Sequence, residues 1–256
     1  MTLGMMFAFF FGLAVGSFLN VCIYRIPLKK SIVSPPSSCP RCGARIRSYD
    51  NIPVLSYILL LGRCRQCRAL ISLRYPLVEV IVGLLSVALF IQCGPSLQYI
   101  SLFLFMAALV AIAFIDLDHK IIPDVISLPG ILAGLAFSFF PSAGIPPLDA
   151  LIGAVGGGAF LFLVAMVFEK VTGREGMGGG DVKLLAMIGA WMGWKALPFI
   201  ILISSFTGAV IGGLSLAISR QGMRSRIPFG PFLSLGTLLF LFFGDEIALW
   251  FYRLGG

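Results

Sequence analysis

Charged residues are scarce in this chain of 256 residues. They make up 12% of it, while 59% of the residues are hydrophobic, against about 25% and about 45–50% in ordinary soluble domains. This balance excludes a soluble enzyme, and the 23 Phe residues and long aliphatic runs exclude an intrinsically disordered chain. The composition therefore predicts an all-α protein that crosses a membrane several times.

Two sequence signals are also missing. No G-x-G-x-x-G turn follows a predicted strand, so we expect no nucleotide pocket of the dinucleotide-binding type. The first apolar run has no basic residue before it and no small-residue cleavage site after it. We therefore expect a retained span rather than a cleaved signal peptide.

About eight apolar runs are candidates for transmembrane helices, each of which needs about 20 mostly apolar residues. The sixth run is shorter than this length. It predicts either a half-buried helix extended by the glycines before it or a helix that thins the bilayer locally. The runs cover residues 3–24, 77–94, 98–115, 125–141, 148–168, 182–194, 197–219 and 228–244.

The basic residues predict the orientation in the membrane. With eight spans, 17 of the 19 Lys and Arg residues fall on one side, in segments 25–76, 116–124, 169–183 and 220–227. The positive-inside rule places these segments in the cytoplasm and both termini outside. The net charge of +8 is thus interpreted as a sign of topology, with the lipid bilayer as partner and no nucleic acid.

The polar segment 26–76 carries two C-x-x-C pairs. Cys39 and Cys42 form the first and Cys64 and Cys67 the second, with 21 residues between the pairs. Two such pairs are typical of a tetrahedral Cys₄ zinc site. Disulfides or free thiols are the alternative, although disulfides are rare in a reducing cytoplasm. We expect a structural zinc that supplies much of the folding free energy of a small cytoplasmic domain.

Only eleven residues are acidic, and six of them are expected to be ordinary solvated residues, on the outer side, in the cysteine loop or among basic residues; the other five are less ordinary. Glu79 lies about one turn into the second run, while Asp116, Asp118, Asp124 and Asp181 lie at the ends of runs. Ionisable groups in such places are costly to bury and indicate function.

Two segments bring carboxylates to the same predicted membrane face. One is 114–124, and the other is the turn Gly178-Gly179-Gly180-Asp181. A pair of Asp side chains that share one proton can activate a water and protonate a leaving amide nitrogen. Glycines before Asp181 would let a substrate backbone or a partner helix approach. The alternative for this turn is a simple helix N-cap.

These motifs resemble those of the type IV prepilin peptidases, membrane-embedded aspartyl proteases with a G-x-G-D motif. The resemblance covers nearly the whole chain and implies that Asp116 and Asp181 are the catalytic pair, with Gly178 and Gly180 in the active-site loop. It is carried, in the family's order, by Gly16–Val21 with Arg25 and Pro27, Asn51–Pro53, the two cysteine pairs, Arg74–Glu79, Ile115–Asp124, Gly178–Asp181 and Pro228–Pro231.

The resemblance also implies the reaction and its location. A member of this family cleaves the short basic leader of type IV prepilins or type II secretion pseudopilins after a Gly, at the cytoplasmic face of the bacterial inner membrane. Many members then methylate the new N-terminus with S-adenosylmethionine. Glu79 and the cysteine loop are the candidates for that cofactor's site, on location alone. The expected domains are a first helix at 1–25, a zinc-binding domain at 26–76 and a peptidase core at 77–256.

Two other functional classes stay open from the sequence. In a proton- or cation-coupled transporter, Asp116 and Asp181 would bind the ion, but they lie at span ends and the chain has no evident internal repeat. In a non-enzymatic assembly protein of a pilus or secretion machine, the cysteine loop would be a docking module.

Overall fold

The computed structural model describes residues 2–173, 178–219 and 228–255, and in these ranges it describes the side chains except those of 215–219, 245 and 247–255. The described chain is helical and has only isolated bridges, Ser38 with Arg45 and Arg63 with Leu70, in place of strands. The basic loop expected at 220–227, and residues 174–177 of the loop expected at 169–183, lie outside the described residues.

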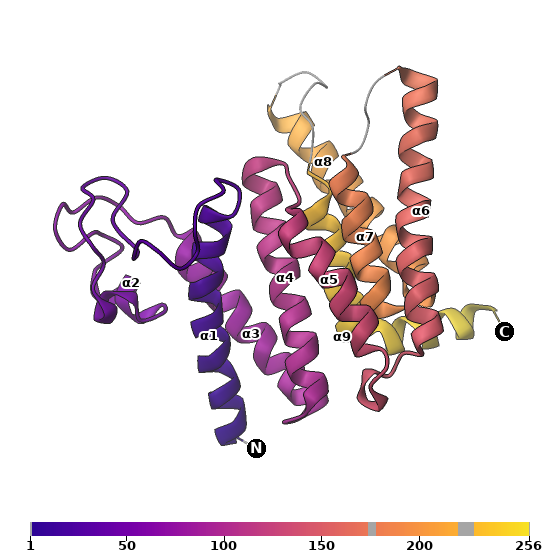
Figure 1. The fold of residues 1–256 in the computed structure, drawn as a ribbon, viewed down its shortest axis with the longest axis horizontal. Coiled ribbons are helices and arrows are strands. Elements are labelled where there is room, and N and C mark those ends of the chain that lie inside the picture. Colours follow the sequence, from indigo (N-terminus) through magenta and orange to yellow (C-terminus); the bar gives the residue numbers. More distant parts are fainter. Residues whose placement is uncertain (1, 174–177, 220–227, 256) are drawn as a thin grey trace. The chain divides into compact units, whose positions relative to one another are not determined.

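Each of the eight apolar runs forms a helix, as expected (Figure 1). Short turns of helix, including α2 (Leu55–Leu59), lie between some of them. The long helices are α1 (Thr2–Arg25), α3 (Arg74–Cys93), α4 (Leu97–His119), α5 (Asp124–Phe137), α6 (Pro147–Thr172), α7 (Gly179–Met192), α8 (Leu197–Ser219) and α9 (Gly230–Gly255).

Within the described residues, five helices are long and apolar enough to cross a membrane: α1, α3, α4, α6 and the segment Trp194–Leu214 that contains most of α8. Helix α5 and the segment Gly230–Gly244 of α9 are apolar but shorter. The chain is therefore a multi-pass membrane protein, and the count of eight spans stays a prediction.

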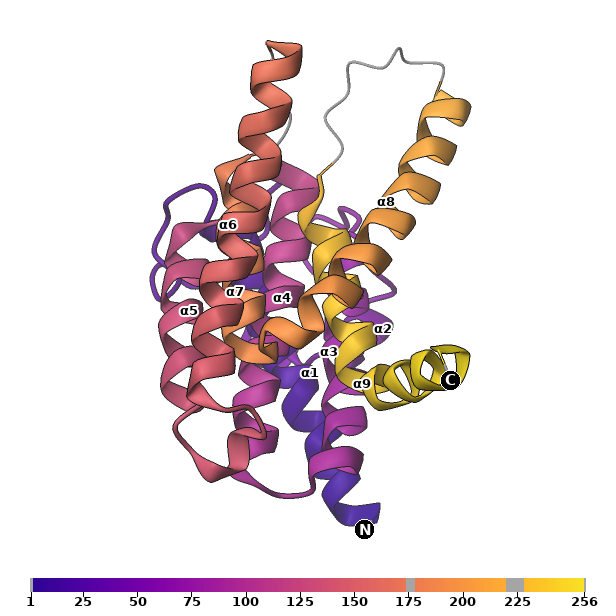
Figure 2. The ribbon, with the colours of Figure 1, turned by 90° about the vertical axis from the view of Figure 1, so that its right-hand side faces the viewer.

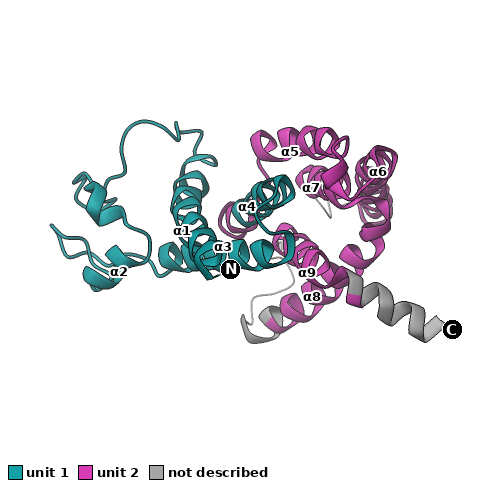
Figure 3. Cartoon of the chain, turned by 90° about the horizontal axis from the view of Figure 1, so that it is seen from below, with its two compact units in different colours: residues 1–111 teal, residues 112–256 magenta. Residues whose placement is uncertain are grey.

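The chain divides into two compact units, residues 1–111 and 112–256 (Figure 3). In the first unit, α1 packs closely against α3 through glycines. A Cβ on Gly12 would lie 2.8 Å from the Gly83 Cα, and one on Gly16 would lie 2.7 Å from the Glu79 Cα. Side chains there would push the two helices apart, so small residues permit the contact.

In the second unit, α7 packs against α5, α6 and α9 (Figure 2). The contact with α6 brings two backbones together, because a Cβ on Gly153 would lie 2.3 Å from the Gly189 carbonyl oxygen. Helix α7 begins at Gly179, within the run of glycines, and most of its residues from Leu184 to Trp191 are buried. This agrees with the expectation of a short helix extended by the glycines before it.

Candidate active site and metal centre

Asp116 lies in the last turn of α4 and is 5% exposed. The helix closes just after it, where the Lys120 N–H donates to the Asp116 carbonyl oxygen at 2.9 Å. The backbone N–H of Gly230, at the start of α9, donates to Oδ2 of Asp116 at 3.0 Å. The side chain is therefore buried with one oxygen held by a backbone donor.

Asp181 is the third residue of α7, so it lies in that helix's first turn. The Gly178 N–H hydrogen-bonds to its carboxylate, and the carboxyl group lies near enough to Asp116 for the two charges to interact. The structure thus brings together the two residues that the sequence motifs indicate as a pair, both within the unit of residues 112–256.

Ile122 fills the space beside the two aspartates. A Cβ on Gly180 would lie 2.9 Å from the Ile122 Cβ, and a Cβ on Gly230 would lie 3.3 Å from its Cδ1 and 2.7 Å from Oδ2 of Asp116. By contrast, no atom lies within 4 Å of a Cβ built on Gly179. Of the two glycines expected in the active-site loop, Gly180 allows close packing and Gly178 supplies a donor to Asp181.

The other two aspartates of segment 114–124 lie differently. Asp118 is exposed. Asp124 is also exposed, and its carboxylate pairs with Lys183 Nζ at 2.7 Å. An exposed pair of this kind contributes about 0–1 kcal/mol to stability, but it does connect the start of α5 to the start of α7. Of the three aspartates in this segment, Asp116 is the one whose charge interacts with that of Asp181.

The four cysteines of the two C-x-x-C pairs converge in the first unit, and their sulfur atoms all lie within 4.8 Å of one another. Each pair sits in a similar turn: the N–H of Cys39 donates to the Ala44 carbonyl oxygen at 2.9 Å, and that of Cys64 donates to Ala69 at 2.8 Å. None of the four is in a disulfide. The cluster can hold a metal ion, as the spacing predicts, and four sulfur donors suit zinc.

Backbone hydrogen bonds stabilise the negatively charged thiolate form of Cys39. Hydrogen bonds from the backbone N–H groups of Cys42 and then Arg41 lower the pKa of the Cys39 thiol to about 6. Because metal ions bind thiolates rather than thiols, these hydrogen bonds favour the form of Cys39 that coordinates a metal.

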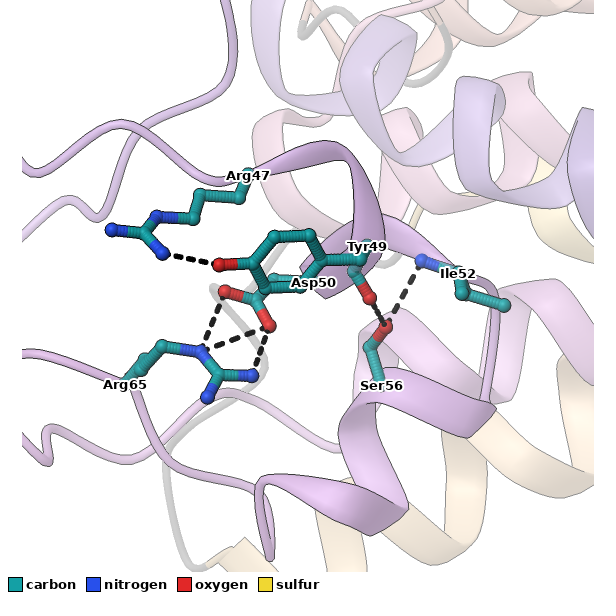
Figure 4. A network of polar contacts seen from close by, with 6 residues as sticks. All are labelled: Arg47, Tyr49, Asp50, Ile52, Ser56 and Arg65. Atoms are coloured by element: carbon teal, nitrogen blue, oxygen red, sulfur yellow. Dashed lines mark hydrogen bonds and ion pairs between the residues drawn. The ribbon is translucent and has the colours of Figure 1, made fainter.

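A polar network joins the second cysteine pair to the segment before α2 (Figure 4). Arg65, which lies between Cys64 and Cys67, donates to both carboxylate oxygens of Asp50, with distances from 2.5 to 3.1 Å. This hydrogen bonding lowers the pKa of Asp50. In the same network Arg47 donates to the Tyr49 hydroxyl, and Ser56 donates to the Tyr49 carbonyl oxygen at 3.0 Å.

Glu79 lies inside α3 and is 7% exposed. The Val54 N–H donates to its Oε2 at 2.7 Å, and Ser17 of α1 also hydrogen-bonds to the carboxylate. Nearby, Asn20 Nδ2 donates to the Tyr75 carbonyl oxygen at 3.0 Å.

The sequence motifs include Ser17, Asn20 and Gly230 but do not indicate what they contact. Only their place in quoted motifs, 16–21 and 228–231, marks them as special. Their partners Glu79, Tyr75 and Asp116 are 55 or more positions away in the chain, so no local pattern identifies them.

Two protein-family models match the chain. Residues 10–93 match the bacterial peptidase A24 N-terminal domain, and residues 103–213 match the type IV leader peptidase family. The second match contains both Asp116 and Asp181. No solved structure was found to match the chain.

Curated relatives are similar over almost their whole length, and each is named prepilin leader peptidase/N-methyltransferase. The relative from Pseudomonas putida is 42% identical over 258 residues, covering 92% of this chain and 89% of the relative. The relative from Aeromonas salmonicida is 41% identical over 270 residues, covering 95% of this chain and 92% of the relative. The relative from Pseudomonas aeruginosa is 41% identical over 271 residues, covering 96% of this chain and 92% of the relative. This chain therefore belongs to the type IV leader peptidase family.

Proposed function

We propose that this protein is a prepilin leader peptidase in which Asp116 and Asp181 are the catalytic pair. It cleaves the basic leader of type IV prepilins or type II secretion pseudopilins after a Gly. The observation that supports this best is the approach of the Asp116 and Asp181 carboxyl groups, which come from the end of α4 and the start of α7. The names of the relatives supply the substrate class.

The reaction needs a base and an acid on either side of one peptide bond. A pair of carboxyl groups that shares a proton supplies both: one accepts the proton of the attacking water, and the other donates a proton to the leaving nitrogen. The Gly230 and Gly178 N–H groups each hold one carboxylate of the pair. Fixed backbone donors of this kind keep both groups in place through the reaction.

The setting of the reaction follows from the charge distribution. We place the protein in the bacterial inner membrane, with the aspartates at the cytoplasmic face and both termini outside, because the basic residues gather on one side of the expected spans. In the same scheme residues 1–25 form a first helix, 26–76 a cytoplasmic domain and 77–256 the peptidase core.

The proposal also includes a structural metal ion and a methyl donor. Cys39, Cys42, Cys64 and Cys67 hold a structural zinc with no open coordination position, since all four positions of a tetrahedral site are filled by sulfur. After cleavage, the protein methylates the new N-terminus with S-adenosylmethionine, as the second half of the relatives' name indicates.

An assay in proteoliposomes tests the proposal against its alternatives. The purified protein is reconstituted with a synthetic prepilin, and both leader release and ion flux are measured. A peptidase releases the leader without driving flux. Flux without release would support a transporter, and binding without either would support an assembly protein.

A further inference from the structure

The linker between α4 and α5 runs beside the aspartate pair. It consists of residues 120–123. Lys120 turns the chain with a left-handed φ of 55° while its N–H donates to the Asp116 carbonyl oxygen at 2.9 Å. The turn brings Ile122 back toward the aspartates, so the linker contributes a side chain to the surroundings of the pair.

The Ile122 side chain contacts the two helix starts that hold the aspartates. A Cβ on Gly180, the residue before Asp181, would lie 2.9 Å from the Ile122 Cβ. A Cβ on Gly230, the backbone donor to Asp116, would lie 3.3 Å from the Ile122 Cδ1 and 2.7 Å from Oδ2 of Asp116. Ile122 therefore borders a carboxyl oxygen of the pair rather than a remote part of the fold.

The neighbouring isoleucine lies differently. Ile121 is 45% exposed, and none of its atoms is among those nearest to the Cβ positions of Gly180 and Gly230. Ile122 is only partly exposed. Of these two adjacent residues of one type, Ile122 is thus the one that limits the space beside the aspartates.

Ile122 is also held rigidly. Its side chain branches at Cβ, which restricts its rotamers, and Pro123 follows it, which restricts its backbone to extended conformations. The Pro123 carbonyl oxygen accepts hydrogen bonds from the N–H of Ser127 at 3.1 Å and from its hydroxyl at 3.3 Å. Because Ser127 is fully buried in α5, the linker is anchored at this end, and Ile122 cannot easily move aside.

A peptide bond can be cleaved here only if its carbonyl carbon approaches both carboxyl groups. The residue before the bond supplies that carbonyl, so its Cα approaches as well. Glycine has no atom beyond its Cα, whereas any other residue adds a Cβ close to Asp116. Ile122 and the backbones at Gly180 and Gly230 crowd this space, so a substrate Cβ would have to displace a rigid side chain.

We propose that Ile122 determines the requirement for glycine before the scissile bond, because it fills the space that a side chain on that substrate residue would need. The inference rests on the proposed function, in which the leader is cleaved after a Gly. A pocket that excludes one methyl group discriminates between substrates by about 10–200-fold.

Leader release from two synthetic prepilins in proteoliposomes tests this role. The substrates differ only in the residue before the scissile bond, which is Gly in one and Ala in the other, and kcat/KM is measured for each. The wild type should prefer the Gly substrate by about 10–200-fold. Because both values come from the same protein, a general loss of stability or activity leaves their ratio unchanged.

Ile122→Val is the most informative variant. It keeps the branched Cβ beside Gly180 and removes Cδ1, so the methyl group of the Ala substrate gains the space of one methyl group of the protein. The preference for Gly should narrow about tenfold. Ile122→Ala should narrow it at least as far, and Ile122→Val decides the matter if the larger change abolishes all release. An unchanged preference in Ile122→Val would overturn the proposal and indicate that glycine is required for its backbone freedom.

Two controls separate this role from a merely structural one. Ile121→Ala changes the exposed neighbour of the same type and should leave the preference for Gly unchanged. A third prepilin carries the alanine at an earlier position of the leader, and its kcat/KM relative to the Gly substrate should be the same in wild type and Ile122→Val. A shift in this second ratio would contradict a role confined to the residue before the bond.

Failure of this proposal is distinguishable from failure of the proposed function. If the wild type released no leader from the Gly substrate, the peptidase itself would be refuted. Release with a strong preference for Gly that persists in Ile122→Val and Ile122→Ala would refute only the role of Ile122.

Discussion

The backbone N–H of Gly230 donates a 3.0 Å hydrogen bond to Oδ2 of Asp116, across 114 positions of sequence. The start of α9 thereby fixes one oxygen of the candidate catalytic pair. No side chain makes this contact, so the geometry of Asp116 depends on the path of the backbone at 230 and on the lack of a Cβ there.

Gly230→Ala should slow leader release by about tenfold to a hundredfold, because small displacements of reacting groups have effects of this size. The new Cβ would lie 2.7 Å from Oδ2 of Asp116 and force the carboxyl group to move. Initial rates on a synthetic prepilin measure the effect. Gly156→Ala is the control, since no atom lies within 4 Å of its Cβ; equal rates for the two variants would contradict the positioning role.

Neighbouring glycines of the loop give a second comparison. Gly180→Ala should reduce leader release about tenfold or more, because its Cβ would lie 2.9 Å from the Ile122 Cβ and displace the start of α7 with Asp181. Gly179→Ala has open space and should retain most of the activity. If Gly179→Ala proved the more damaging change, the packing of Ile122 would not explain the motif.

A substitution where α6 crosses α7 should lower the stability of the protein rather than its catalytic rate. Gly153→Ala would place a Cβ 2.3 Å from the Gly189 carbonyl oxygen, and overpacking of this kind costs about 1–3 kcal/mol. We expect a lower melting temperature in detergent. Gly156→Ala, on the same helix, should be neutral or slightly stabilising, because Ala is the better helix former. A Gly153→Ala protein as stable as wild type would show that the helices can separate freely.

The cysteine cluster should contain about one zinc per chain. Elemental analysis of the wild type and of Cys39→Ser with Cys64→Ser tests this, and unchanged metal content in the variant would contradict it. Protons compete with the metal for all four thiolates, and the pKa of the Cys42 thiol is raised to about 11, so zinc affinity should already fall as the pH drops from alkaline values. Metal removal should destabilise the segment 26–76 more than it slows leader release, since the metal supplies folding free energy to that segment.

Local signals in the sequence predicted much of this molecule. Hydrophobic runs indicate helices wherever about 20 apolar residues follow one another, and the C-x-x-C spacing indicates the sulfur cluster, which is present. Helix ends were less predictable: the run 125–141 forms α5 only over Asp124–Phe137, and the run from 228 begins its helix at Gly230. Apolar residues continue past a helix end when a turn is buried or faces lipid, so composition alone does not locate it.

Contacts between distant segments could not be predicted. The donor to Glu79 is the backbone of Val54, and the donor to Asp116 is that of Gly230; a backbone N–H has no signature in the side-chain pattern. The two carboxylate segments were predicted because carboxylates beside membrane helices are rare enough to be considered singly, and the choice of Asp116 and Asp181 within them came from the resemblance to the G-x-G-D peptidases.

The central claim is tested most directly by leader release from a synthetic prepilin by four variants in proteoliposomes. Asp116→Asn and Asp181→Asn should each reduce the initial rate to background, because a pair that acts as a unit fails when either member is lost. Asp118→Asn and Asp124→Asn, at exposed positions, should retain most of it. An active Asp116→Asn protein beside an inactive Asp118→Asn protein would contradict the assignment of the pair.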